Sequence, residues 1–142
     1  QVEAYISTPA RKKKALYICG HSLGGAMAAL AASRLQDRVV ACYTYGQPRA
    51  GGRVWASKCT FEHHRYVNNN DIVPRVPFAV MGFRHRGELH YINYYGYIRK
   101  MTPWQIIKDG WRGRIRAWSK RGFFGGARDY SMDLYEAKIA KN

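Results

Sequence analysis

The residues most able to carry chemistry form one short block, Gly20-His21-Ser22-Leu23-Gly24, which fits the pattern G-x-S-x-G. The block lies between an apolar run over residues 15–19, which predicts a buried strand, and an alanine-rich stretch over residues 26–35, which predicts a helix. In such a sharp turn the glycines relieve crowding, the serine hydroxyl is exposed, and the backbone N–H of Leu23 can stabilise an oxyanion. Ser22 is therefore a candidate nucleophile. The alternative is a glycine-rich turn that only packs or binds a phosphate.

A serine nucleophile needs a base and a carboxylate that orients the base, and with this motif the chain order is serine, acid, histidine. Asp71 is the candidate acid, because it follows a strand-like segment over residues 64–67 and lies in a turn that Pro74 closes. The alternative for this residue is an ordinary Asx turn. Among the five histidines, His85 and His90 follow the candidate acid in the chain, but we expect all five to be structural or surface residues.

The elements that must position these residues alternate between strand and helix. A second apolar run over residues 39–45 predicts another buried strand, followed by a short helix and the strand over residues 64–67. This alternation predicts an α/β fold with a mainly parallel sheet and flanking helices. Residues 89–93 and 97–99 flank a turn and predict a small hairpin.

Large apolar residues recur at spacings of three and four after a helix start signal at Thr102-Pro103. They are Trp104, Ile107, Trp111, Ile115 and Trp118. One interpretation is a helix that packs this stripe against the core and exposes a basic face. A second is docking on an anionic membrane surface, and a third is contact with RNA or an acidic protein.

The composition is strongly basic, with 24 Lys and Arg against 9 Asp and Glu and a formal net charge of +15 over 142 residues. No RNP, KH or zinc-ligand pattern occurs, so the sequence does not predict specific nucleic-acid binding.

Three cysteines without a CxxC pair predict reduced thiols and favour an intracellular compartment, organelles such as the mitochondrion included. The spacing of the histidines and cysteines predicts no metal site. The sequence contains no dinucleotide-binding or phosphate-loop motif, so we expect no cofactor. The first residues show no signal-peptide pattern, and no apolar run approaches the ~18 residues of a membrane span.

Five ordered blocks of the sequence resemble the class 3 lipases of the α/β-hydrolase fold. They cover residues 16–26, 43–49, 65–75, 83–88 and 129–135. The resemblance implies that Ser22 is the nucleophile, that Asp71 is the acid of the triad, and that the substrate class is a glycerolipid ester.

The chain departs from this family in two respects. The family carries its catalytic histidine in an Asp-His-Ser-Met-like block, and here Tyr130 occupies the histidine position. A phenol with a pKa near ~10 is neutral at pH 7 and cannot readily accept the serine proton. The family also has a preceding region with further strands, a lid and a second oxyanion donor, and this region is not in the 142 residues.

We therefore expect residues 1–142 to form the C-terminal half of a class 3 lipase-like domain, impaired or inactive in catalysis. Its partners would be the missing N-terminal half or other chains of a larger assembly, because a bare sheet edge and apolar face need cover. The first alternative is a serine ester hydrolase that a separate N-terminal half makes active. The second is a basic module that binds a membrane or nucleic acid.

Overall fold

The structure, a computed structural model, describes residues 2–69, 71–111 and 131–142. Its helices are α1 (Val2–Ile6), α2 (Pro9–Lys12), α3 (Leu23–Arg34), α4 (Arg53–Lys58), a helix over residues 103–111, and α6 (Met132–Ile139). Two 3₁₀ turns cover Val73–Arg75 and Ala79–Met81. Its strands are β1 (Leu16–His21), β2 (Val39–Tyr45), β3 (Gly51–Gly52), β4 (Glu62–Asn68), β5 (Phe83–Arg84), β6 (Glu88–Ile92) and β7 (Ile98–Arg99).

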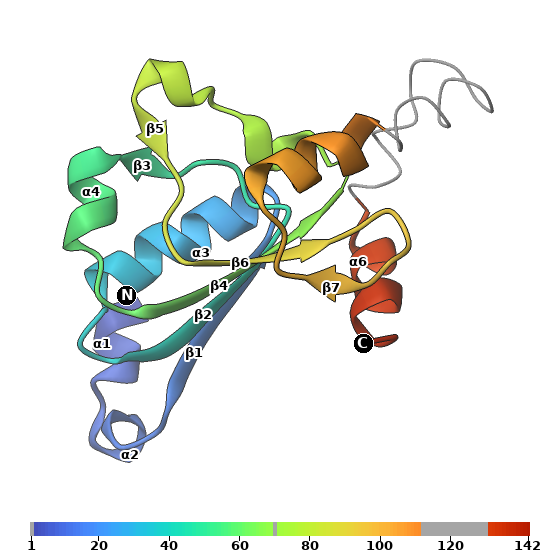
Figure 1. The fold of residues 1–142 in the computed structure, drawn as a ribbon. Helices are drawn as coiled ribbons and strands as arrows, with labels where there is room; N and C mark the ends of the chain where they lie inside the picture. The colour runs from blue at the N-terminus through green and yellow to red at the C-terminus, as the bar shows by residue number, and fades with distance from the viewer. Residues whose placement is uncertain (1, 70, 112–130) are drawn as a thin grey trace.

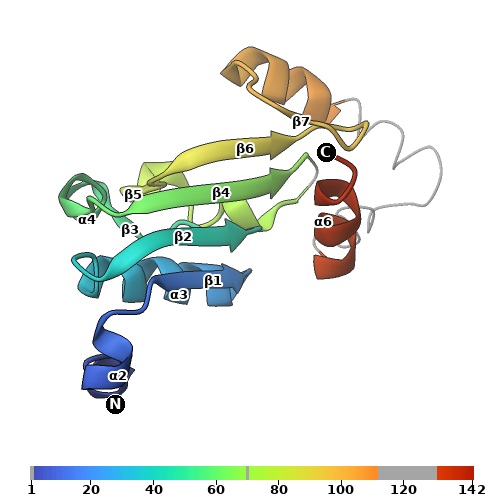
Figure 2. The same ribbon diagram turned by 90° about the horizontal axis from the view of Figure 1, so that it is seen from below.

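The main sheet has five strands in the order β1-β2-β4-β6-β7, and its first four strands run parallel (Figures 1 and 2). Strand β7 pairs antiparallel with β6, and β3 with β5 forms a separate two-stranded sheet. The expected α/β fold with a mainly parallel sheet is confirmed. The predicted hairpin is also confirmed, but its first strand, β6, belongs to the main sheet as well, where it pairs with β4.

One face of the sheet is packed against α3, and this contact forms the hydrophobic core (Figure 1). Four of the five alanines of α3 are buried, because their small side chains let the helix backbone approach the strands closely. The core cluster consists of Ala28, Ala32, Val39, Cys42, Cys59 and Phe61, with Leu16, Ile18, Leu35 and Trp55 packed around it. Burial raises the pKa of the Cys42 thiol to about 12, which keeps this cysteine protonated and unreactive.

The opposite face of the sheet is lined with aromatic and imidazole rings. The rings of Tyr43 and His64 stack at 5.1 Å between centroids, and those of Tyr66 and His90 stack at 4.8 Å. Within the described ranges β1 pairs on one side only, so it is an edge strand, and Tyr17 on it is exposed. The bare edge that the sequence predicts is therefore present.

The helix over residues 103–111 contradicts the interpretation of a stripe packed against the core. The side chains of Trp104, Ile107 and Trp111 are 68%, 51% and 62% exposed, whereas Asp109 is buried. The Asp109 carboxylate accepts hydrogen bonds from the Tyr91 hydroxyl at 3.1 Å and the Tyr94 amide at 3.0 Å. These bonds direct the face of the helix that carries Asp109 toward β6 and the turn after it. Ile115 and Trp118, the rest of the stripe, lie outside the described residues.

Across the described ranges, no helix combines the length and the apolar character that a membrane crossing requires.

Candidate active site

Ser22 lies at the turn between β1 and α3 in a strained backbone conformation. Its φ is 57° and its ψ −129°, and it is the only non-glycine residue with positive φ among those described. Such a conformation costs about 1–3 kcal/mol and persists only where the surroundings enforce it. The Ser22 amide donates to the Tyr45 carbonyl at 2.9 Å, and the Ser22 carbonyl accepts from the Gly25 amide at 2.9 Å. These bonds hold the turn between β2 and the first turn of α3, as a nucleophile elbow requires.

Close approach of the backbone explains the glycines of this turn. A Cβ at Gly20 would lie 2.3 Å from the Gly24 carbonyl oxygen, and one at Gly25 would lie 3.0 Å from the Gly20 oxygen. A Cβ at Gly24 would meet nothing within 4 Å. Sterically, the turn therefore depends on Gly20 and Gly25, and the second glycine of the sequence motif is not required by packing.

Leu23 is the first residue of α3, so its amide belongs to the positive end of the helix dipole. Its side chain is exposed, and the candidate oxyanion donor is its backbone N–H. This placement agrees with the predicted role, which stays a prediction.

Asp71 lies just beyond the end of β4 and is almost completely buried. One carboxylate oxygen, Oδ1, accepts from the Val73 amide at 2.9 Å, which is an Asx-turn hydrogen bond. The other, Oδ2, accepts from the Tyr135 hydroxyl at 2.7 Å. Asp71 therefore forms the Asx turn that was the alternative for this residue, and it is also a buried carboxylate held in one orientation.

Tyr135 on α6 is the residue of this site that sequence reasoning missed. It is fully buried, and its hydroxyl oxygen also accepts from the Asn68 amide at 2.9 Å. Its ring contacts the His21 ring edge-on, with 6.0 Å between centroids. Helix α6 lies at the end of the sheet to which the parallel strands point (Figure 2). Tyr135 therefore links the turn of Asp71 to His21, the last residue of β1 and the chain neighbour of Ser22.

Gly46 makes room for this arrangement at the end of β2. Its φ is +57°, and a Cβ there would lie 2.6 Å from the Asp71 Oδ2 atom and 3.3 Å from the Tyr135 hydroxyl oxygen. Any larger residue would push into the hydrogen bond between Asp71 and Tyr135. The glycine is needed both for its conformation and for the space beside the carboxylate.

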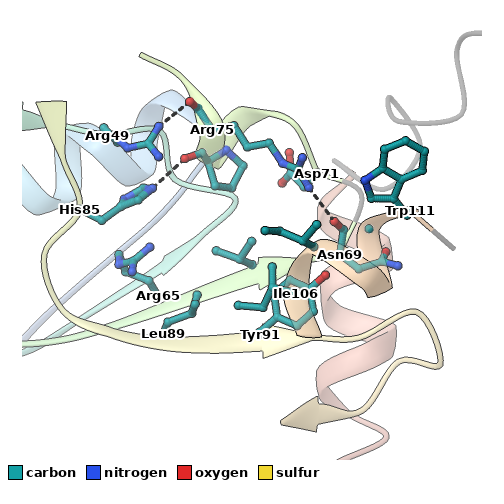
Figure 3. A pocket seen from close by; sticks show the side chains of 14 residues that line it. Arg49, Arg65, Asn69, Asp71, Arg75, His85, Leu89, Tyr91, Ile106 and Trp111 are labelled. Carbon is teal, nitrogen blue, oxygen red and sulfur yellow. Dashed lines mark hydrogen bonds between the residues drawn. The ribbon is translucent and has the colours of Figure 1, made fainter. Parts of the chain in front are cut away.

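A cavity of about 320 Å³ lies beside Asp71, between the sheet and the helix over residues 103–111 (Figure 3). Its lining combines apolar side chains with three guanidinium groups. These groups belong to Arg49, Arg65 and Arg75, and the apolar side chains include Val67, Leu89, Ile106, Ile107 and Trp111. Ser22 does not line the cavity, so an ester bound there would not meet the candidate nucleophile.

Arg65 is the most unusual side chain of this cavity. It is 7% exposed, and its Nε atom has no hydrogen-bond partner among the described residues. Burial, and secondarily the nearby Arg49, lower the pKa of Arg65 to about 10. Arg49 itself donates to the carbonyls of Pro77, at 2.8 Å, and Arg75, and so ties the loop after Asp71 to the end of β2.

The comparison with known proteins assigns the family. The family model described as Lipase (class 3) matches residues 1–81, which is more than half of the chain and includes the elbow and Asp71. The chain belongs to the class 3 lipase family.

Curated relatives agree with this class 3 lipase assignment. A triacylglycerol lipase of Ricinus communis is 35% identical over 129 residues, and the match covers 75% of this chain and 24% of that protein. The toxin TseL of Vibrio cholerae serotype O1 is 45% identical over 75 residues, and the match covers 49% of this chain and 12% of the toxin. The chain therefore spans at most about a quarter of the length of these two relatives.

Solved structures show the same fold. The lipase of Rhizopus microsporus var. chinensis matches with a TM-score of 0.56 and 34% identity, over 64% of this chain and 34% of that one. The propeptide complex of Rhizomucor miehei lipase matches with a TM-score of 0.57 and 32% identity, over 68% of this chain and 34% of that one. The fold of this class 3 lipase domain is thus that of the α/β-hydrolase lipases.

Tyr130, which the sequence predicts to occupy the family's histidine position, lies outside the described residues. The structure describes the chain again from Ser131, whose side chain caps α6 by accepting from the Leu134 amide at 3.3 Å. The substitution of histidine by tyrosine at the base position stays a prediction from the sequence.

The described histidines are engaged in other contacts. His85 donates from Nε2 to the Pro74 carbonyl at 2.7 Å, and burial, with Arg65 as a second cause, lowers its pKa to about 4. His63 contacts the Thr44 hydroxyl at 3.0 Å, and burial lowers its pKa to about 3. Imidazoles with such low pKa values are poor proton acceptors near pH 7. The expectation that these two are structural histidines agrees with their contacts.

Proposed function

We propose that this chain is a lipase-like domain that keeps the class 3 elbow as part of its fold while ester hydrolysis is impaired. The observation that carries the lipase-like part is the strained Ser22 backbone between β1 and α3, because strain of this kind is maintained at functional sites. The impairment follows from Tyr130 at the base position, since a neutral phenol does not take the serine proton.

We further propose that the domain acts as a subunit within a larger assembly. The chain aligns with about a third of each related lipase structure, and β1 presents an unpaired edge in the described part of the chain. An exposed parallel edge is a template for pairing with another chain. A segment that precedes these residues, or another polypeptide that supplies further strands, would cover it.

The alternative is an active serine hydrolase once that preceding part is supplied. Ser22 would then attack the carbonyl carbon of a glycerolipid ester, and the Leu23 amide would stabilise the oxyanion with a second donor from the added part. Asp71 would orient a histidine base, which returns its proton to the leaving alcohol before water releases the fatty acid.

The test replaces Tyr130 by histidine and measures hydrolysis of p-nitrophenyl butyrate. Wild type, Tyr130→His and the control Tyr95→His, at an exposed tyrosine, are each assayed alone and with the N-terminal part of a related class 3 lipase. We expect turnover only in Tyr130→His, and we expect Ser22→Ala in that background to abolish it.

Two outcomes contradict the proposal in different ways. Ser22-dependent turnover by the wild-type chain would show that the domain is an active enzyme. No turnover by Tyr130→His under any condition would show that the elbow is not a retained catalytic site. For the subunit role, a native mass measured in a cell extract that corresponds to the chain alone would contradict assembly.

A second candidate function, docking on an anionic lipid surface, is favoured by the exposed side chains on the helix over residues 103–111. Trp104, Ile107 and Trp111 are each more than half exposed, although Ile107 and Trp111 also line the cavity beside Asp71. The Lys108 ammonium lies 5.9 Å from the centroid of the Trp104 ring. Tryptophan beside lysine or arginine is the composition that settles at a membrane interface, and the net charge of +15 favours anionic lipids.

Vesicle binding tests this second function. We expect the chain to co-sediment with phosphatidylglycerol vesicles and much less with phosphatidylcholine vesicles. The double variant Trp104→Ala/Trp111→Ala should lose binding, whereas Tyr95→Ala, at an exposed tyrosine on another segment, should keep it. Equal binding by all three proteins would contradict docking through this helix.

A further inference from the structure

Three side chains with metal-binding atoms converge on the sheet face opposite α3. His64 is on β4, and Glu88 and His90 are on the neighbouring parallel strand β6, in a register that places Glu88 beside His64. Since alternate residues of a strand point to the same side, Glu88 and His90 face the same way. The core residue Cys42 pairs with His63, so its neighbour in the chain, His64, points away from the core.

The three donor atoms are close enough to bind one ion. His64 Nδ1 lies 3.0 Å from His90 Nε2, and Glu88 Oε2 lies 3.8 Å from the first nitrogen and 3.9 Å from the second. Two donor atoms that each lie about 2.1 Å from one zinc ion are about 3.4 Å apart at a tetrahedral angle. The carboxylate would have to approach by only a few tenths of an ångström, and Glu88 is half exposed, which leaves its side chain free to adjust.

The surroundings orient these donors as the outer shell of a metal site does. His64 Nε2 lies 2.6 Å from Glu62 Oε1, so the carboxylate accepts its proton and leaves the Nδ1 lone pair directed at the cluster. Ligating histidines usually carry such a carboxylate on their second ring nitrogen. Lys100 lies 3.6 Å from the other oxygen of Glu88, Oε1, and so does not occupy the oxygen that faces the histidines.

Stacked rings fix the two imidazoles in place. Tyr43 stacks on His64 at 5.1 Å and Tyr66 stacks on His90 at 4.8 Å between centroids. Preorganised ligands lose little conformational entropy on binding, which favours a site on rigid strands over one on loops.

We propose that His64, Glu88 and His90 form a binding site for a divalent metal ion of the zinc class, with a fourth position left to water. Two imidazoles and one carboxylate suit zinc and cobalt, whereas magnesium and calcium require oxygen ligands. Without metal, one imidazole of the pair donates to the other between His90 Nε2 and His64 Nδ1. With metal bound, His90 would carry its single proton on its own Nδ1 atom, which leaves the lone pairs of His90 Nε2 and His64 Nδ1 for the ion. The ion would link β4 to β6 and is separate from the proposed ester chemistry.

The spacing of histidines and cysteines in the sequence predicted no metal site. The proposal contradicts that expectation, and the experiment below decides between them. The ligands come from two strands that are neighbours only in the sheet, so no local motif records them. The cluster was found among the described residues.

The experiment is zinc titration of the 142-residue chain by calorimetry, with cobalt absorption spectra as a second readout. We expect one equivalent of zinc to bind and the thermal midpoint to rise, with magnesium producing neither effect. His90→Ala and Glu88→Gln should weaken zinc binding at least tenfold. Glu62→Gln, which removes only the outer carboxylate, should weaken it by about 10–100-fold while one equivalent still binds.

The matched control is Glu136→Gln, at an exposed glutamate outside the cluster, and it should bind zinc as the wild type does. Zinc affinity unchanged in His90→Ala and Glu88→Gln would overturn the proposal. A thiolate-to-cobalt charge-transfer band would also overturn it, because it would assign binding to the cysteines. Glu88 is half exposed, so Glu88→Gln should leave the fold intact and give the circular dichroism spectrum of wild type. With that spectrum unchanged, weaker zinc binding by the variant reports the loss of a ligand and not unfolding.

Discussion

Replacing Tyr135 by phenylalanine tests whether the contact between α6 and the acid turn holds this part of the fold together. The substitution removes one oxygen and leaves the ring in place, so it creates almost no cavity. It deletes the 2.7 Å hydrogen bond to Asp71 Oδ2 and the 2.9 Å hydrogen bond from the Asn68 amide. All three residues are buried, so water cannot easily replace the lost partner.

The magnitude follows from these two bonds. A hydrogen bond to a charged group contributes about 1.5–3 kcal/mol, and a buried amide left without a partner costs about 1–3 kcal/mol. We therefore expect Tyr135→Phe to lower the free energy of unfolding by about 3–5 kcal/mol. With a urea m-value of about 1–3 kcal/mol/M, the unfolding midpoint falls by roughly 1–5 M.

The assay is urea unfolding followed by circular dichroism, with Tyr95→Phe as the matched control at an exposed tyrosine. The control should change the free energy of unfolding by less than about 0.5 kcal/mol. A double-mutant cycle with Asp71→Asn should give a coupling of about 1 kcal/mol or more for Tyr135 and none for Tyr95. If Tyr135→Phe is no less stable than Tyr95→Phe, the reasoning is wrong.

Three further predictions concern the elbow, the buried histidines and the exposed helix. Gly20→Ala should unfold the chain or lower its thermal midpoint sharply, because the new Cβ would lie 2.3 Å from a backbone oxygen. Gly24→Ala is the control in the same melting experiment, and it should be close to wild type because its Cβ would meet nothing within 4 Å. The folded-state pKa values of His63 and His85, about 3 and about 4, lie below the unfolded value of 6.5, so only the unfolded chain binds these protons between pH 6.5 and 4. The contribution of these two histidines to the free energy of unfolding is therefore full above pH 6.5 and falls on acidification, by up to about 4 kcal/mol in total between pH 6.5 and pH 5. In urea unfolding measured at each pH, His85→Asn should halve the slope of the free energy of unfolding against pH. Asp109→Ala should lower the free energy of unfolding by about 2–3 kcal/mol, because the Tyr91 hydroxyl and the Tyr94 amide lose their acceptor, and a change below 0.5 kcal/mol in urea unfolding would contradict this role.

The elbow could be predicted from sequence because everything that defines it is local. An apolar run, two glycines around a serine and an alanine-rich stretch all lie within residues 15–35, and each favours the same strand, turn and helix. The Asp71 turn was likewise readable from its neighbours, since the Asx-turn hydrogen bond joins residues two apart.

The apolar stripe shows where local pattern reasoning stops. The spacing of Trp104, Ile107 and Trp111 correctly indicated one face of a helix, but it could not say whether that face meets the core or solvent. A buried carboxylate on the other face, Asp109, settled the orientation through its hydrogen bonds to residues of β6 and the following turn. A single charge-assisted contact can outweigh the gain from burying a stripe that finds no partner surface.

By itself, the sequence determined the fold class, the strand–turn–helix around Ser22 and the position of Asp71, because periodicity, glycine sterics and turn chemistry act between near neighbours. Only the tertiary structure decided that Tyr135 from α6 binds Asp71 and that the apolar stripe is largely exposed. It also decided that His64, Glu88 and His90 meet on one face of the sheet. These contacts join segments far apart in the chain. Their formation depends on strand register and helix placement, which cooperative packing of the whole domain determines.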